Sequence, residues 1–197
     1  AFFAAEDADS RDAAGRLVEG AFYAWTREEV FAALPNAATA KAAIATLGLD
    51  APPRIEAGTV PVLARGRAIS EGLLDPVLDR LREAREARPR PIRDEKVIAG
   101  WDGLMIRALA EGARAFDRPD LLDAATRAAE ALRATHRAGA GLARLRAGGR
   151  ALETGLLEDH AWTGLGFLAL FEAGAGEVWR DRAAELAEAA VARFGDG

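Results

Sequence analysis

Residues 101–116 read WDGLMIRALAEGARAF, and residues 162–172 repeat the opening and the apolar rhythm as WTGLGFLALFE. The two stretches align at a constant offset of 61 residues, the distance from Trp101 to Trp162. Each stretch is apolar at positions one helical turn apart, and each is followed by a second helical pattern. The sequence therefore predicts a helical hairpin that occurs twice.

The helices of these hairpins differ in how many of their sides are apolar. The first helix of the second pair, expected over about 156–171, is apolar nearly all round, which is typical of a helix buried on most sides. Its partner, over about 178–194, has one apolar face and one charged face, as an outer helix has. Inner and outer helices that alternate side by side build an open solenoid or a closed α/α toroid. The repeat is longer than the roughly 34–47 residues of common helical solenoids, which leaves room for functional loops at one rim.

Ahead of the repeat, local signals predict three further helices. Thr26 and Glu29 form a capping box that begins one helix, and Asn36 can cap the next. A stripe of leucines and a valine predicts a third helix over 70–88. Before this third helix, residues 60–63 are expected to form a short strand or an extended arm.

We therefore expect an all-α fold, in which helical hairpins form part of an (α/α)6 toroid and carry a small inserted β-hairpin. Residues 1–69 are assigned to an N-terminal segment with two helices and an extended arm. Residues 70–136 and 156–195 are assigned to the helical hairpin region. The β-hairpin is expected near 141–150, where glycines and alternating leucine and arginine interrupt the helical pattern.

Composition argues against several classes of function. Cysteine is absent, which excludes disulfides and thiol chemistry, and a total of two histidines, His136 and His160, argues against a multi-histidine zinc site. The net charge of −5 and the mixing of basic with acidic residues argue against nucleic-acid binding. No apolar run reaches the roughly 18 residues of a membrane span, and no signal-peptide pattern opens the sequence. We expect a cytoplasmic protein that uses no metal or cofactor and binds no nucleic acid or membrane.

Four segments in consistent order resemble the spermatogenesis-associated protein 20 family: AEDADS at 5–10, EGAFYAWT at 19–26, DEKVIAGWDGLMI at 94–106 and LED at 157–159. Its bacterial members are often called thioredoxin-domain-containing or YyaL-like proteins. The resemblance implies a thioredoxin-like domain followed by an (α/α)6 barrel, similar to those of N-acylglucosamine 2-epimerases and six-hairpin glycosidases. Because this chain has neither cysteine nor a thioredoxin-like pattern, it is expected to be the central part of that barrel.

Two positions depart from the family pattern. The family usually has asparagine where this chain has Asp102, and tyrosine or phenylalanine where it has His160. Family motifs that precede the 5–10 segment are also missing. These departures argue against assuming a complete active site in this chain.

The candidate site consists of polar and aromatic residues, most of them at the starts of the two inner helices. In barrels of this kind, these helix ends line a central cleft, and corresponding ends of neighbouring helices face one rim. The candidate catalytic residues are Asp94, Lys96, Asp102, Glu158 and Asp159. The candidate substrate-binding residues are Trp101, Trp162, His160, Tyr23 and Trp25.

Carboxylates beside tryptophan rings are typical of sugar chemistry. The rings stack on the apolar faces of pyranoses, one carboxylic acid protonates the leaving oxygen, and a second acts on water or as the nucleophile. A sugar epimerase would instead place one or two bases beside an acidic carbon. We therefore expect a carbohydrate-related domain, epimerase-like or glycosidase-like, that acts on a small molecule or glycan.

Each candidate also has a structural interpretation. Capping and the helix dipole favour Asp and Glu at helix starts whatever the function. Asp94 and Lys96 can form a local ion pair, and Trp101 and Trp162 can fill the core. The alternative function is therefore a non-catalytic binding or regulatory scaffold that accompanies a thioredoxin-like domain, or an inactive fragment. Two carboxylates about 5–9.5 Å apart in one open cleft would favour the enzyme, and closed contacts would favour the scaffold.

Overall fold

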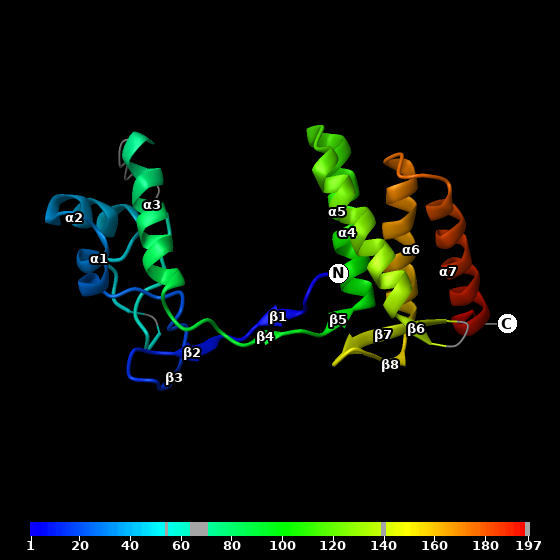
Figure 1. The fold of residues 1–197 in the computed structure, drawn as a ribbon, viewed down its shortest axis with the longest axis horizontal. Helices are drawn as coiled ribbons and strands as arrows, with labels where there is room; N and C mark the ends of the chain where they lie inside the picture. Colours follow the sequence, from blue (N-terminus) through cyan, green and yellow to red (C-terminus); the bar gives the residue numbers. More distant parts are fainter. Residues whose placement is uncertain (54, 64–70, 139–140, 196–197) are drawn as a thin grey trace. The chain divides into compact units, whose positions relative to one another are not determined.

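The computed structural model describes residues 1–53, 55–63, 71–138 and 141–195. The chain forms two compact units (Figure 1). The hairpin unit consists of Ala1–Ala5 with Asp94–Gly197, and the N-terminal unit consists of Glu6–Arg93. The described residues are mostly helical, with seven helices and several small sheets, so the expected all-α class is too narrow.

The hairpin unit contains the two predicted helical hairpins, packed next to each other. The first consists of α4 (Ala99–Phe116) and α5 (Pro119–Thr135), and the second of α6 (Leu157–Glu172) and α7 (Val178–Phe194). Helix α4 packs against both α5 and α6, and α6 also packs against α7, so α4 and α6 are the inner pair (Figure 1). A single apolar core joins all four helices and includes Ile106, Leu132, Phe167, Leu170 and Trp179.

Helices α4 and α6 approach so closely that only glycine fits at their contact. A Cβ atom on Gly103 would lie 2.6 Å from the backbone of Thr163, and one on Gly166 would lie 2.6 Å from the carbonyl oxygen of Gly103. Near the start of the contact, Gly100 lies against Asp159. Because the contact then advances along both helices in the same direction, the helices are parallel and begin at the same end of the unit.

Helix α6 is less buried than its sequence predicts. Its leucines at positions 157, 165 and 168 are 52%, 40% and 37% exposed. Phe167, Ala169 and Leu170 face the core instead. The expectation that α6 is buried nearly all round is therefore wrong for this chain, because its apolar surface is larger than what α4, α5 and α7 cover.

A four-stranded sheet lies beside the starts of α4 and α6 (Figure 1). Strands β7 (Gly141–Ala147) and β8 (Arg150–Thr154) form the predicted β-hairpin, which extends four residues beyond the expected 141–150. Its turn holds Gly148 and Gly149 at φ values of 53° and 78°, a conformation that favours glycine. The short strands β5 (Val97–Ile98) and β6 (Arg137–Ala138) also pair with β7 in antiparallel fashion.

The N-terminal unit is built around three helices. These are α1 (Arg27–Ala33), α2 (Ala37–Thr46) and α3 (Glu71–Glu86), with a small hairpin of β2 (Asp9–Arg11) and β3 (Leu17–Glu19). Two-residue strands β1 (Ala5–Glu6) and β4 (Arg93–Asp94) pair where the chain passes between the units. The capping box at the start of α1 and the Asn36 cap of α2 are both confirmed.

Helix α3 belongs with the N-terminal helices rather than with the hairpin region 70–136 to which the sequence assigned it. Its buried residues Val77 and Leu81 share a core with residues of α1 and α2, because they form the apolar stripe that predicted the helix. Residues 60–63 form no strand; they are an arm, tied by a 2.9 Å hydrogen bond from the Val62 amide to the Leu47 carbonyl.

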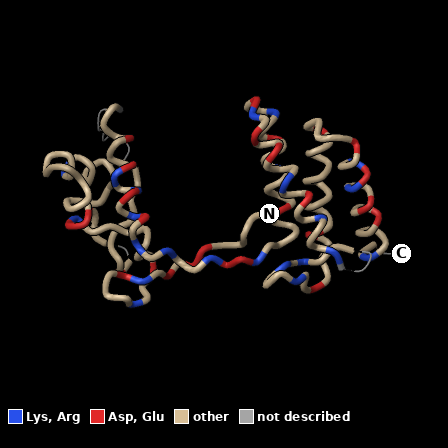
Figure 2. Tube along the Cα trace, viewed as in Figure 1, with Lys and Arg blue, Asp and Glu red and all other residues tan. Residues whose placement is uncertain are grey.

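Charge is mixed throughout the chain. Figure 2 shows basic and acidic residues interspersed along the helices of both units. Within the described ranges, no helix combines the length and the apolar character that crossing a membrane requires. The same ranges contain no group of three or more histidine, aspartate or glutamate side chains placed to hold a metal ion.

Candidate functional site

Asp159 connects the beginnings of the two inner helices. Its Oδ1 atom accepts a hydrogen bond of 3.1 Å from the Gly100 amide in the first turn of α4. Its Oδ2 atom accepts one of 2.9 Å from the Leu156 amide at the N-cap of α6. These amides have no partner within their own helices, so a single carboxylate satisfies one free donor of each. With 1% exposure, Asp159 is a buried clamp between α4 and α6.

Arg144 compensates the buried charge of Asp159. Its Nη1 atom, on a side chain of β7, lies 3.2 Å from Asp159 Oδ2 and 2.9 Å from Glu158 Oε1. Glu158 is exposed, and its hydrogen bond to Arg144 raises the pKa of the guanidinium. Glu158 and Asp159 are therefore brought together, but they share an arginine instead of facing an open cleft.

Asp102 is also buried, at 1% exposure, in the first turn of α4. Its Oδ1 atom accepts a 3.0 Å hydrogen bond from the Phe2 amide, which holds the 1–5 segment against the hairpins. Burial raises the pKa of the Asp102 carboxyl above its ordinary value of 3.8, although the Phe2 amide and the nearby His136 act in the opposite direction. Ionisation of this carboxyl is therefore opposed by the loss of its hydration.

The raised pKa of Asp102 predicts a pH-dependent effect of Asp102→Asn. The carboxyl stabilises the fold fully below its unfolded pKa, and this contribution is lost as the pH rises through the higher folded pKa. Asparagine accepts the Phe2 hydrogen bond without a charge. We expect the variant to melt at a higher temperature than the parent at about pH 7.5, with the gain shrinking toward about pH 4. Parallel melting curves, with exposed Asp123→Asn as the control, check this; an equal shift at both pH values would contradict it.

Asp94 and Lys96 form the local ion pair that their structural interpretation predicts. Lys96 Nζ lies 3.1 Å from Asp94 Oδ2, and the Lys96 amide donates to Asp94 Oδ1 over 3.2 Å. The Lys96 side chain, followed by its amide, lowers the pKa of the Asp94 carboxyl. This pair lies where β4 leads into β5, at the surface of the hairpin unit.

The two tryptophans at the inner helix starts are exposed. Trp101 is 56% exposed on α4 and Trp162 is 38% exposed on α6, which contradicts the alternative that they fill the core. Leu104, Met105 and Leu165 are exposed to a similar degree. The inner helices therefore present an aromatic and aliphatic face, which we call the tryptophan face.

His160 is one of the buried residues of α6. Its Nδ1 atom lies 2.8 Å from the Leu156 carbonyl oxygen, so the hydrogen there points into the helix start. Its ring packs edge-on against Phe194, with centroids 5.6 Å apart. His160 also lines the end of an apolar hollow of about 370 Å³ between α6 and α7. None of the five candidate catalytic residues lines this hollow.

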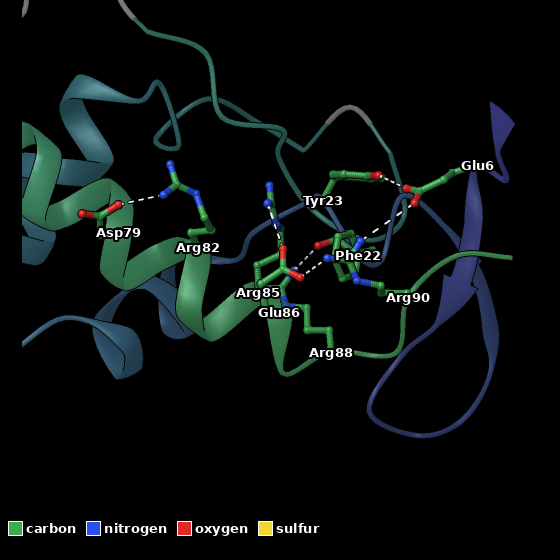
Figure 3. A network of polar contacts seen from close by, with 9 residues as sticks. All are labelled: Glu6, Phe22, Tyr23, Asp79, Arg82, Arg85, Glu86, Arg88 and Arg90. Carbon is green, nitrogen blue, oxygen red and sulfur yellow. Dashed lines mark hydrogen bonds and ion pairs between the residues drawn. The ribbon is translucent and has the colours of Figure 1, made fainter. Parts of the chain in front are cut away.

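Tyr23 and Trp25 belong to the N-terminal unit, where Tyr23 is part of a polar network (Figure 3). The Tyr23 hydroxyl donates to Glu6 over 2.7 Å, and this hydrogen bond raises the pKa of the phenol. Trp25 is buried, and the Arg88 guanidinium lies 4.2 Å from its ring centroid. Arg88 also donates to the Ala24 carbonyl over 2.6 Å, so this network fixes the 22–25 segment against the end of α3.

Three contributors to the inner helix starts were not among the predicted site residues. Arg144 was recognised in the sequence only as part of an alternating β pattern, and the Phe2 and Gly100 amides carry no side-chain signal. His136 is the C-cap of α5; it is buried, and its ring lies 3.0 Å from the Val97 carbonyl oxygen. The contacts of Asp159 and Asp102 favour the interpretation that these two carboxylates stabilise the fold over the interpretation that they are catalytic.

Two parallel inner helices clamped at their starts, each backed by an outer helix, define a class of protein: one built of repeated helical hairpins. No family model matches the chain. It is 29% identical to human spermatogenesis-associated protein 20 over 99% of its own length and 30% of that protein, and the mouse protein gives the same figures. It is 31% identical to the uncharacterized protein B0495.5 of Caenorhabditis elegans over 66% of its length and 22% of that protein.

The mammalian homologues thus carry the name of the family that the four segments resemble, which confirms this resemblance. It spans less than a third of the length of these relatives.

Proposed function

We propose that the hairpin unit is a scaffold that binds a carbohydrate through its tryptophan face, as a sector of an α/α toroid in a cytoplasmic protein. The observation that carries this proposal is the contrast between buried carboxylates and exposed rings at one end of the unit. Both oxygens of Asp159 are occupied by backbone amides and Arg144. A carboxylate held in this way organises the site but is not available to exchange protons with a substrate.

The chemistry of the tryptophan face fits a sugar. Trp101 and Trp162 lie in the first two turns of neighbouring parallel helices, and both expose their indoles. Flat, rigid rings bind the apolar faces of pyranoses with little loss of conformational entropy. Exposed Glu158, four residues before Trp162, offers carboxylate oxygens to the hydroxyl groups at the edge of a sugar.

Glycan binding by the full-length protein tests the proposal. We expect Trp101→Ala and Trp162→Ala each to weaken binding of the best soluble oligosaccharide about tenfold, because each removes one stacking surface. Phe116→Ala is the matched control: Phe116 is 76% exposed at the opposite end of α4 and should change the affinity less than about twofold. Equal affinities for the parent and both tryptophan variants, measured by calorimetry, would overturn the proposal.

The second candidate function is an epimerase-like or glycosidase-like enzyme. It is favoured by the Asp102 carboxyl, whose raised pKa is a property of general acids, and by exposed Glu158. The same glycans decide between the two candidates. Turnover by the full-length protein, abolished in Glu158→Gln and Asp94→Asn variants that still fold, would favour the enzyme; binding without turnover favours the scaffold.

A further inference from the structure

We propose that the hairpin unit has a second binding site, separate from the tryptophan face, that takes the phosphate group of a small molecule. The site is a hollow of about 160 Å³ between the outer helices α5 and α7, with β6 and β7 at its edge. Three arginines from three different elements line it: Arg133 of α5, Arg137 of β6 and Arg182 of α7. None of the candidate residues of the tryptophan face contributes to it.

Two of these arginines have their charge uncompensated. Among the described residues, neither Arg133 nor Arg137 has a carboxylate within ion-pair distance or a hydrogen-bond partner for its guanidinium. Their guanidinium groups are therefore free to bind an anion. Arg182 differs, because its Nη1 atom lies 2.9 and 2.8 Å from the two carboxylate oxygens of Glu185.

His136, which is 1% exposed, forms part of the wall of the hollow. Its Nε2 atom lies 3.0 Å from the Val97 carbonyl, and its Nδ1 atom lies 3.0 Å from the Thr135 hydroxyl oxygen. The Thr135 hydroxyl itself donates to the Ala131 carbonyl over 2.7 Å. Both ring nitrogens therefore already have oxygen partners, so His136 is a fixed part of the wall, and the arginines supply the positive charge of the hollow.

The size and lining of the hollow limit its ligand. Its volume is below the roughly 300–1,000 Å³ of pockets for drug-sized ligands, so a compact molecule fits. Guanidinium groups bind phosphate oxygens in pairs and match their geometry better than ammonium groups do. Leu132, Leu142 and Phe167 give the remaining wall an apolar surface against which a short carbon skeleton packs. A small phosphate monoester meets all three conditions.

Titration of the protein with inorganic phosphate at constant ionic strength tests the site. The arginine Nε–H signals in nuclear magnetic resonance spectra report binding, and glycerol phosphate serves as a second, monoester probe. We expect saturable binding that weakens about tenfold or more when Arg133→Gln and Arg137→Gln are combined. Arg127→Gln is the matched control, since Arg127 is exposed on the same helix outside the hollow. It should change the affinity less than about twofold.

A variant with the opposite expected effect keeps the test independent of misfolding. Glu185→Gln releases Arg182 and removes a negative charge from the rim, so phosphate should bind severalfold more tightly. Non-saturable binding, or an equal loss in the Arg127 control and the double variant, would overturn the proposal. Vesicles containing phosphatidic acid distinguish a lipid headgroup from a soluble monoester: binding to vesicles but not to glycerol phosphate would overturn the small-molecule assignment.

Discussion

Alanine in place of Gly103 is expected to separate α4 from α6 and lower the free energy of unfolding of the hairpin unit by about 3 kcal/mol. The added methyl group would lie 2.6 Å from the Thr163 amide nitrogen and 2.6 Å from the Trp162 carbonyl carbon. Both are backbone atoms of α6, so no side chain can rotate to make room. The gain in helix propensity, about 1 kcal/mol, is too small to offset the clash.

Chemical denaturation followed by tryptophan fluorescence measures this effect, because the tryptophans of both inner helices report on their contact. Gly112→Ala is the control on the same helix. There the new methyl group would lie 3.5 Å from Leu121, at ordinary contact distance, so the variant should be neutral or more stable by about 0.5–1 kcal/mol. If the Gly103 and Gly112 variants were equally stable, the close parallel packing of α4 and α6 would be refuted.

The helices themselves could be predicted from the sequence because their signals are local. The expected helix 156–171 corresponds to α6 at Leu157–Glu172, and the expected 178–194 is the extent of α7. The caps at Thr26 and Asn36 depend on side chains within three residues of the amides that they bind. Apolar periodicity and capping act over one helical turn, so a single sequence contains all the information that they need.

The contacts of the candidate residues could not be predicted from the sequence, although the residues at the inner helix starts could be named. The Asp159 carboxylate binds the Gly100 amide 59 positions away, and backbone amides leave no trace in residue identity. Gly103 and Gly166 could have indicated the close contact of α4 with α6. Glycine inside a helix lowers stability relative to alanine, so its presence there implies a packing reason. The exposure of Trp101 depends on which surfaces have neighbours, and helical periodicity alone does not determine that.

Asp159→Asn is expected to destabilise the hairpin unit by about 2–3 kcal/mol at neutral pH. The amide has one oxygen, so it can accept from the Gly100 amide or from the Leu156 amide but not from both in the present geometry. Its NH2 group then faces a backbone donor, and one buried N–H loses its partner. Arg144 also loses the charge of its buried partner, but its side chain is 27% exposed, so water limits this part of the cost.

Glu158→Gln tests whether the instability of Asp159→Asn comes from the lost contacts between the two helices or only from the lost negative charge beside Arg144. Glu158 is adjacent in sequence and contacts the same Nη1 atom of Arg144, but its side chain is 55% exposed. An exposed ion pair contributes little, so the variant should lie within about 0.5 kcal/mol of the parent. Denaturation curves of both variants measure the difference. If Asp159→Asn were as stable as Glu158→Gln, the carboxylate would not join the two helices, and a role in proton transfer would become the better explanation for its position.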